Sequence, residues 1–161
     1  MKVIIFGNAG SGKSTLARKL IGKEAAALLS LDKVAFQSGT ERRPLQDSIM
    51  DMQDFISDNE SWIIEGCYSD ILESAVNLCE ELYFLNPGIE ACIAHCRSRP
   101  WEPEKFSSPE EQHKHLDNLI DWIVSYKTRS DEYGLDRHRA LFESFRGRKY
   151  EFKDPREYES V

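Results

Sequence analysis

Features typical of several protein classes are missing from this sequence. No apolar run approaches the roughly 18 residues that a membrane-spanning helix needs, and the N-terminus shows no signal-peptide pattern. The four cysteines lack the spacing of a disulfide scaffold. Acidic residues outnumber basic ones by 28 to 21, which gives a net charge of −7 and no basic stripe for nucleic acid. We therefore expect a reduced, cytoplasmic protein that binds neither a membrane nor a nucleic-acid duplex.

The overall amino-acid composition is that of an ordinary globular protein. Hydrophobic residues make up 40% and charged residues 30% of a chain of 161 residues, which is enough for one domain with a substantial core. The chain shows no internal repeat and no linker that would divide it. We therefore predict a single domain over residues 1–161.

A glycine-rich loop follows the first apolar run, Val3 to Phe6, which is typical of a strand buried on both faces. The loop has the pattern G-x-x-x-x-G-K-S, and helical periodicity begins directly after it. This strand–loop–helix context is what a phosphate-binding loop requires. The predicted binding residues are Gly7, Asn8, Ala9, Gly10, Ser11, Gly12, Lys13, Ser14 and Thr15.

The residue types of this loop suit the binding of a nucleoside triphosphate. The glycines allow a tight turn whose N–H groups form a nest for anions, and the following helix adds the positive end of its dipole. Lys13 can reach the β- and γ-phosphates, and the hydroxyl of Ser14 can bind Mg²⁺. The alternative is an ordinary glycine-rich turn, against which the flanking strand and helix argue.

The rest of the chain alternates short apolar runs with segments of helical periodicity. This alternation predicts an α/β fold with a parallel five-stranded sheet flanked by helices. The carboxyl ends of all strands should then lie beside the phosphate-binding loop. Besides the first strand, we predict strands over 27–31, 61–66, 82–85 and 149–152, helices over 13–22, 45–58, 70–78, 88–98, from 113 to a break near Gly134, and over 135–146, loops over 33–44 and 99–112, and a polar tail from 154.

Two acidic residues end predicted strands on that edge. Glu65 ends the third apolar strand and has the position of a carboxylate that binds Mg²⁺ directly or through water; the alternative is a solvated strand-end carboxylate. Asp32 follows the second strand and could orient or deprotonate an acceptor hydroxyl, or join the outer shell of the metal. Equally, Asp32 could cap the next helical segment.

The segment 97–113 is rich in proline and is predicted to form a small lid. Arg97 and Arg99 lead into it, and closure of the lid would bring a guanidinium group to the transferring phosphoryl group. The alternative interpretation is two surface arginines at a helix C-terminus, where cations are favoured.

Three further arginines are also candidates. The loop 33–44 is predicted to face the acceptor, and its Arg42 and Arg43 could hold an acceptor phosphate or form an exposed pair before a proline. Arg129 follows Tyr126 on the predicted long helix and is a second-rank candidate for contact with the transferring phosphoryl group.

Other groupings have simpler interpretations. Cys92, His95 and Cys96 lie within one helical turn, but the two cysteines complete an apolar stripe, which favours burial over zinc binding. Cys67 follows a strand near the predicted site, yet it has no evident histidine partner for a catalytic thiol. Trp122 and the tyrosine four residues after it are better explained by packing than by base stacking.

Taken together, these motifs resemble the small P-loop kinases of the adenylate-kinase-like superfamily. The sequence is most similar to the adenylate-kinase-related topology modulation (FlaR-like) proteins. The resemblance spans nearly the whole chain, and its first 90 residues are the more specific part. It rests on Gly7-Asn-Ala-Gly-Ser-Gly-Lys-Ser-Thr-Leu-Ala-Arg18-Lys-Leu20, Leu29-Ser-Leu-Asp32, Ser61-Trp62-Ile-Ile-Glu-Gly66-Cys-Tyr68-Ser69, Leu82-Tyr-Phe-Leu85 with Pro87, and Arg97-Ser-Arg99.

The resemblance implies a core-and-lid kinase fold with ATP and Mg²⁺ at the loop, and lid arginines that correspond to Arg97 and Arg99. Relatives usually carry Asp-Gly where this chain has Glu65-Gly66, a change that keeps the charge and alters the metal geometry. We therefore expect Mg²⁺-dependent transfer of the γ-phosphoryl group of ATP to a small acceptor, a nucleoside or a nucleotide. The alternatives are an ATP-hydrolysing regulatory switch without a small-molecule acceptor and a nucleic-acid end kinase.

Overall fold

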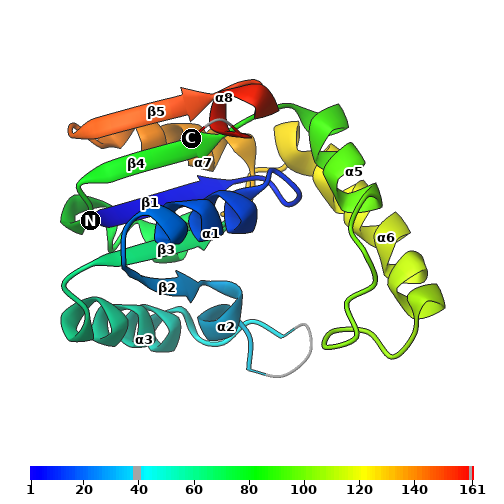
Figure 1. The fold of residues 1–161 in the computed structure, drawn as a ribbon, viewed down its shortest axis with the longest axis horizontal. Coiled ribbons are helices and arrows are strands. Elements are labelled where there is room, and N and C mark those ends of the chain that lie inside the picture. The colour runs from blue at the N-terminus through cyan, green and yellow to red at the C-terminus, as the bar shows by residue number, and fades with distance from the viewer. Residues whose placement is uncertain (38–40, 160) are drawn as a thin grey trace.

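The computed structural model describes residues 1–37, 41–159 and 161, and within them five strands form one sheet. All neighbouring strands are parallel, in the order β2-β3-β1-β4-β5 (Figure 1). The predicted fold class is therefore confirmed. The strands are β1 (Lys2–Gly7), β2 (Ala27–Ser30), β3 (Trp62–Gly66), β4 (Glu81–Leu85) and β5 (Arg148–Phe152).

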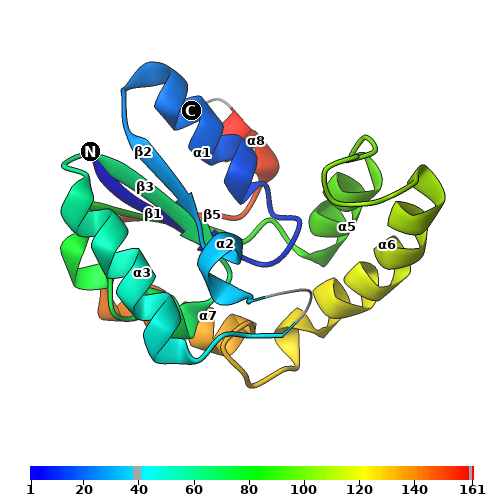
Figure 2. The same ribbon diagram turned by 90° about the horizontal axis from the view of Figure 1, so that it is seen from below.

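Helices connect the strands and cover both faces of the sheet (Figure 2). In the described part of the chain, no helix combines the length and the hydrophobicity needed to cross a membrane. The helices are α1 (Lys13–Lys23), α2 (Asp32–Ala35), α3 (Leu45–Asp58), α4 (Ser69–Leu72), α5 (Ile89–Arg97), α6 (Pro109–Val124), α7 (Leu135–Ser144) and α8 (Pro155–Glu159), with 3₁₀ turns η1 (Val76–Leu78) and η2 (Ser125–Lys127).

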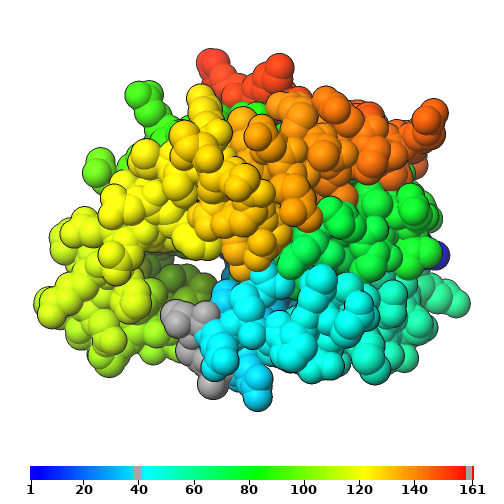
Figure 3. Space-filling view, turned by 180° about the vertical axis from the view of Figure 1, so that it is seen from behind, coloured from blue at the N-terminus to red at the C-terminus, as the bar shows by residue number. Residues whose placement is uncertain are grey.

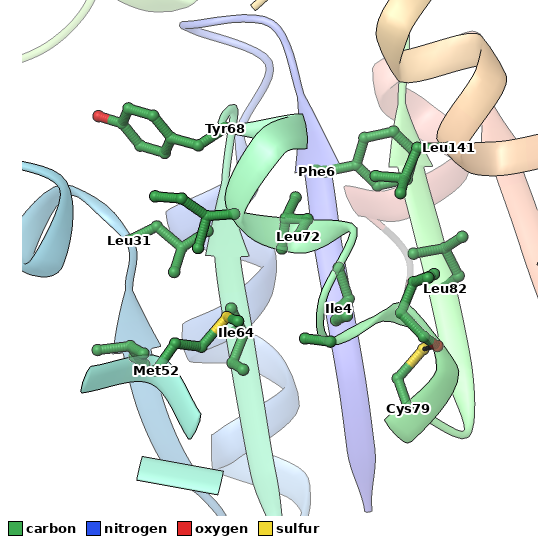
Figure 4. Close-up of a cluster of buried hydrophobic side chains, with 14 of the residues drawn as sticks. Ile4, Phe6, Leu31, Met52, Ile64, Tyr68, Leu72, Cys79, Leu82 and Leu141 are labelled. Carbon is green, nitrogen blue, oxygen red and sulfur yellow. Dashed lines mark hydrogen bonds between the residues drawn. The ribbon is translucent and has the colours of Figure 1, made fainter. Parts of the chain in front are cut away.

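The alternation of side chains along β1 divides the core into two layers. Val3 and Ile5 belong to a cluster with α1 and α8. Ile4 and Phe6 belong to a larger cluster with α3, α4 and α7, part of which Figure 4 shows. Helices cover both faces of the sheet, so side chains on both sides of the central strands β1 and β3 are buried. This explains why both strands consist mainly of consecutive apolar residues.

Helices α5 and α6 form an arm that extends beyond the carboxyl ends of the strands (Figures 1 and 2). They pack on each other through a third cluster that includes Cys92, Cys96 and Ile123. Ala9 of the glycine-rich loop packs against this cluster as well. The arm is therefore anchored directly on the loop that follows β1.

The long helix α6 begins at Pro109, four residues before the predicted start. Ser108 caps it, because the Ser108 hydroxyl accepts a hydrogen bond of 3.1 Å from the backbone N–H of Glu111. Pro109 occupies the first helical position, where the missing N–H costs nothing. The loop predicted over 99–112 from its prolines therefore ends at Ser108, and its last residues belong to α6.

Four other local predictions differ from the structure. The long helix predicted to run to a break near Gly134 ends at Val124. The loop predicted over 33–44 contains the one-turn helix α2 and a bridge between Phe36 and Arg42, and its residues 38–40 lie outside the described residues. The helix predicted over 70–78 is split into α4 and η1, since the Ser74 hydroxyl bonds to the carbonyl of Ile71 and competes with the helical ladder. The polar tail contains α8, whose Tyr158 is 5% exposed.

Candidate nucleotide-binding site

The predicted phosphate-binding loop joins β1 to α1 at the centre of the sheet. Gly10 and Gly12 have φ angles of 76° and 98°, a left-handed conformation that side chains other than glycine rarely adopt. A Cβ atom on Gly10 would lie 2.6 Å from the carbonyl oxygen of Cys92 and 2.7 Å from the sulfur of Cys96. The glycines therefore serve both the turn and the close approach of α5.

Side chains from three different segments bond to carbonyl oxygens of this loop. The Lys13 ammonium donates to the carbonyl of Asn8 at 2.7 Å, and the Tyr158 hydroxyl donates to that of Ser11 at 2.7 Å. Nδ1 of His95 lies 2.8 Å from the carbonyl oxygen of Gly10, and it must carry the proton because a carbonyl only accepts. These bonds fix the peptide planes whose N–H groups would hold a phosphate.

A carboxylate and a hydroxyl meet beside the loop. The Ser14 hydroxyl donates to Oε1 of Glu65 at 3.2 Å. Glu65 is 5% exposed and lies in register with Ile5 of β1 and Ser30 of β2. Glu65 is therefore a buried carboxylate near the carboxyl end of an inner strand. The alternative of a solvated carboxylate at the strand end is wrong. Its oxygen atoms and the Ser14 hydroxyl are ligands of the type that Mg²⁺ prefers.

Asp32 is exposed and lies in the first turn of α2, where a negative charge is favourable. Its Oδ1 accepts a hydrogen bond from the hydroxyl of Tyr68, a residue of the loop between β3 and α4. Figure 4 shows that the Tyr68 hydroxyl points away from the apolar cluster beneath its ring. The carboxylate of Asp32 thus has one fixed partner and an open side.

Arg97 and Arg99 lie at the C-terminal end of α5, and both are exposed. Neither forms an ion pair within the described residues. Burial raises the pKa of the Cys96 thiol, and the nearby charges of Arg99 and Lys13 oppose this shift. Arg99 thus lies close enough to Cys96 of α5 for its charge to act on that thiol. Arg97 instead lines a surface depression with Glu90, Ile93, Ala94 and Ser98.

The arginines of the acceptor-side loop are neither an exposed pair nor free cations. Arg42 bonds to Asp70 at 3.2 Å and to Glu132 at 3.1 Å. Arg43 bonds to Asp51 at 2.6 Å and to the carbonyl of Val34 at 3.0 Å. Both guanidinium groups tie this loop to neighbouring elements. The sequence could not show the pairing of Arg42, because its carboxylate partners lie 28 and 90 positions away.

Arg129 forms a bidentate ion pair with Asp131, with N–O distances of 2.8 and 2.6 Å. Its guanidinium carbon lies 3.6 Å from the centre of the Trp122 ring, close enough for a strong cation–π contact. Trp122 is 37% exposed and also packs against Tyr133 with ring centres 4.9 Å apart. The guanidinium group of Arg129 is therefore part of a partly buried cluster with Asp131 and Trp122.

The zinc and thiol alternatives find no support. No group of three metal-binding side chains occurs among the residues that the structure describes. Cys92 and Cys96 are buried in the arm, and His95 bonds to the loop. Burial raises the pKa of the Cys67 thiol to about 12, which leaves it protonated and a poor nucleophile at neutral pH.

Several site residues were missed in the sequence because no local pattern marks them. Tyr158 lies 147 positions from its partner in the loop. Tyr68, whose hydroxyl bonds to Asp32, lies in a stretch that contributes to the family resemblance but contains no motif that marks this tyrosine. His138 has 0% exposure and bonds to Tyr126 at 2.6 Å and to the carbonyl of Cys67 at 2.8 Å, beneath the site.

Comparison with known proteins shows the fold. No protein family model and no curated protein matches the chain. It is similar to a shikimate kinase from Bacteroides thetaiotaomicron (18% identity, TM-score 0.58, 98% of this chain and 92% of that chain). It is also similar to a deoxyadenosine kinase from M. mycoides solved with bound dATP (13% identity, TM-score 0.52, 97% and 92% covered). The chain therefore has the fold of small P-loop kinases, while these comparisons give no support to the narrower topology modulation subfamily.

Proposed function

We propose that this protein is a Mg²⁺-dependent phosphotransferase that uses ATP to phosphorylate a small acceptor. The observation that carries the proposal is the contact of Ser14 with the buried Glu65 beside a complete phosphate-binding loop. Phosphoryl transfer needs an anion cradle, a metal site and an oriented acceptor group. The loop, the Ser14–Glu65 pair and the exposed Asp32 offer one candidate for each.

Each residue has a proposed role. Lys13 and the loop N–H groups bind the β- and γ-phosphates, and Arg99 stabilises the charge of the transferring group, with Arg97 as the second lid candidate. Ser14 and Glu65 would hold Mg²⁺, which when bound neutralises phosphate charge. Asp32 accepts the proton of the acceptor hydroxyl or orients that group.

The proposed acceptor is a nucleoside or a nucleotide. The likeness to a deoxyadenosine kinase favours an acceptor of this kind, and the likeness to a shikimate kinase shows that other small acceptors use the same fold.

The test is ATP-dependent phosphotransfer to a panel of nucleosides and nucleotides, measured for the wild type and for Lys13→Ala. The variant should lose at least about 10³-fold in turnover, because it removes a cation from the developing phosphate charge. Lys23→Ala, an exposed lysine at the other end of α1, is the matched control. Unchanged phosphotransfer in Lys13→Ala would overturn the proposal.

The same assay distinguishes the kinase from the alternative of an ATP-hydrolysing regulatory switch. A switch protein would bind ATP through Lys13 and hydrolyse it slowly, and no acceptor on the panel would raise ATP consumption. An acceptor-dependent increase that requires Lys13 supports the kinase, and its absence across nucleosides, nucleotides and small hydroxylated metabolites supports the switch.

A further inference from the structure

The guanidinium group of Arg42 lies next to the proposed acceptor site. This group already forms ion pairs with two carboxylates of the protein. Nη2 of Arg42 lies 3.2 Å from Asp70, and Nη1 lies 3.1 Å from Glu132 and 2.7 Å from the hydroxyl of Tyr133. The same group lies over the ring of Tyr68, with its central carbon 5.1 Å from the ring centre. Tyr68 in turn donates to Asp32. The side chain of Tyr68 therefore contacts both Arg42 and Asp32, the carboxylate proposed to act on the acceptor hydroxyl.

The second cation of this region is paired in the same way. Arg129 is held by both oxygen atoms of Asp131 and covers one face of Trp122. Asp131 also accepts a hydrogen bond from the backbone N–H of Tyr133, and its pKa is lowered by its bonds with Arg129, so it stays ionised near neutral pH. Both guanidinium groups are therefore paired with carboxylates, while Nε of Arg42 is buried without a hydrogen-bond partner among the described residues.

The local charge balance is negative. The carboxylates of Asp32, Asp70, Asp131 and Glu132 lie among these contacts, against the two guanidinium groups of Arg42 and Arg129. A phosphate or carboxylate on the acceptor would have to take Arg42 from its partners and leave those partners as unpaired, partly buried charges. Breaking such a pair costs more than exposed ion pairs do.

Aromatic rings form a continuous wall through the same region. The ring centres of Phe36 and Tyr68 are 6.0 Å apart, those of Tyr68 and Tyr133 are 5.4 Å apart, and those of Tyr133 and Trp122 are 4.9 Å apart. Phe36, Tyr133 and Trp122 are partly exposed. Figure 3 shows the surface hollowed beside α6. Neighbouring rings meet edge to face, and the paired guanidinium groups of Arg42 and Arg129 lie over some of their faces. The exposed parts of Phe36, Tyr133 and Trp122 therefore offer apolar ring surface beside cations that are already paired.

Resting on the proposed function, we infer that the acceptor is an uncharged hydroxyl compound with a flat ring, a nucleoside rather than a nucleoside monophosphate. The ring packs against the aromatic wall, and a hydroxyl reaches the open side of Asp32. The paired arginines exclude acceptors that carry their own phosphate. In the reaction the hydroxyl oxygen forms a bond to the γ-phosphorus of ATP, the bond to the β-bridging oxygen breaks, ADP leaves, and Asp32 takes the hydroxyl proton.

The experiment compares matched acceptors on the full chain with ATP and Mg²⁺. Adenosine, guanosine, cytidine, uridine and their 2′-deoxy forms are assayed beside the corresponding 5′-monophosphates. We expect kcat/KM for the best nucleoside to exceed that of its own monophosphate by at least tenfold. A monophosphate that equals or exceeds its nucleoside overturns the inference and leaves the kinase proposal intact.

Binding separates failure of this inference from failure of the proposed function. Acceptor affinity is measured by calorimetry in the presence of a non-hydrolysable ATP analogue, independently of turnover. Tighter binding of a nucleoside than of its monophosphate supports the inference even where no phosphotransfer occurs, and that lack of transfer counts against the kinase proposal alone. Tighter binding of the monophosphate, or binding of neither compound, overturns the inference.

A variant tests the role of the paired carboxylates. Asp70→Asn with Glu132→Gln keeps the shape of both side chains and releases the charge of Arg42. The ratio of monophosphate to nucleoside kcat/KM should rise about tenfold or more, since the freed guanidinium becomes available for bidentate phosphate binding. Glu73→Gln, which pairs with Arg137 on the surface near Asp70, should leave the ratio unchanged. If the double variant folds and the ratio stays the same, the paired carboxylates do not exclude anionic acceptors.

Discussion

The hydroxyl of Tyr158 donates a hydrogen bond of 2.7 Å to the carbonyl oxygen of Ser11, so the last helix of the chain holds the first loop. Tyr158 is 5% exposed, and a Cβ atom on Gly12 would lie 3.3 Å from its ring. The tyrosine thus supports the glycine-rich loop from behind with both its ring and its hydroxyl. An anion site of this kind depends on loop geometry that is fixed before the ligand arrives.

The first prediction concerns this support. Tyr158→Phe removes the hydrogen bond and keeps the ring, so the dissociation constant for ATP should rise about three- to tenfold, as expected for about 1 kcal/mol. Tyr158→Ala also removes the packing and should weaken binding further. Calorimetric titration with ATP and Mg²⁺ measures both effects. Tyr150→Phe, at a tyrosine that is 44% exposed, is the control; equal affinities for Tyr158→Phe and the wild type would show that the hydroxyl does not support the loop.

The second prediction concerns the proposed metal site. Glu65→Gln keeps the shape of the side chain and removes its charge, so the Mg²⁺ concentration needed for half-maximal turnover should rise, and turnover at saturating ATP should fall by roughly 10²-fold or more. A Mg²⁺ titration of phosphotransfer measures both quantities. The exposed Glu60 provides the control variant Glu60→Gln. An unchanged Mg²⁺ dependence in Glu65→Gln would remove this residue from the metal site.

The third prediction compares two glycine-to-alanine substitutions. Gly10→Ala places a Cβ 2.6 Å from a backbone oxygen at a left-handed φ of 76°, so we expect a loss of several kcal/mol in unfolding free energy and of ATP binding. Gly22 lies in α1 with no atom within 4 Å of an added Cβ. Gly22→Ala should therefore stabilise the protein by about 0.5–1 kcal/mol. Denaturant unfolding of both variants measures the difference, and a Gly10→Ala variant as stable as the wild type would contradict the packing of α5 on the loop.

The fourth prediction concerns His138 and the pH dependence of stability. The carbonyl of Cys67 only accepts, so Nε2 of His138 carries the proton and Nδ1 accepts from Tyr126, which is a neutral tautomer. Burial lowers the pKa of His138 to about 4. Between pH 6.5 and about 4 the unfolded chain binds a proton that the folded protein excludes. The stability contributed by the neutral ring is thus complete above about pH 6.5 and is lost as the pH falls toward 4, by about 2 kcal/mol at pH 5.

The measurement is urea unfolding at pH 7.5 and pH 5.0. His138→Gln can still donate to Cys67 and does not titrate, so its loss of stability between the two pH values should be smaller than that of the wild type. The exposed His113 provides the control His113→Gln, which should follow the wild type. If His138→Gln and the wild type lose stability equally, the buried ring is not the source of the acid sensitivity.

The fold could be predicted from local patterns because each carries its own physical cause. Continuous apolar runs such as Val3 to Phe6 are buried on both faces, and that requires a parallel sheet with helices on both sides. Gly10 and Gly12 mark the tight turn before Lys13. Local predictions were wrong where one residue type is common in two kinds of structure. Proline is common both in loops and at the first position of a helix, and Pro109 begins α6 inside a stretch predicted to be a loop.

The sequence by itself determined the sheet, the position of the glycine-rich loop and the acidic residues at the strand ends. Strand direction and turn chemistry are set by neighbours along the chain, so they can be recognised there. Only the tertiary structure decided that Glu65 is buried against Ser14, that Arg42 is paired with Asp70 and Glu132, and that Tyr158 holds the loop. These relationships join residues from 28 to 147 positions apart. Charge pairing and hydrogen bonding depend on distance in space, which no local pattern records.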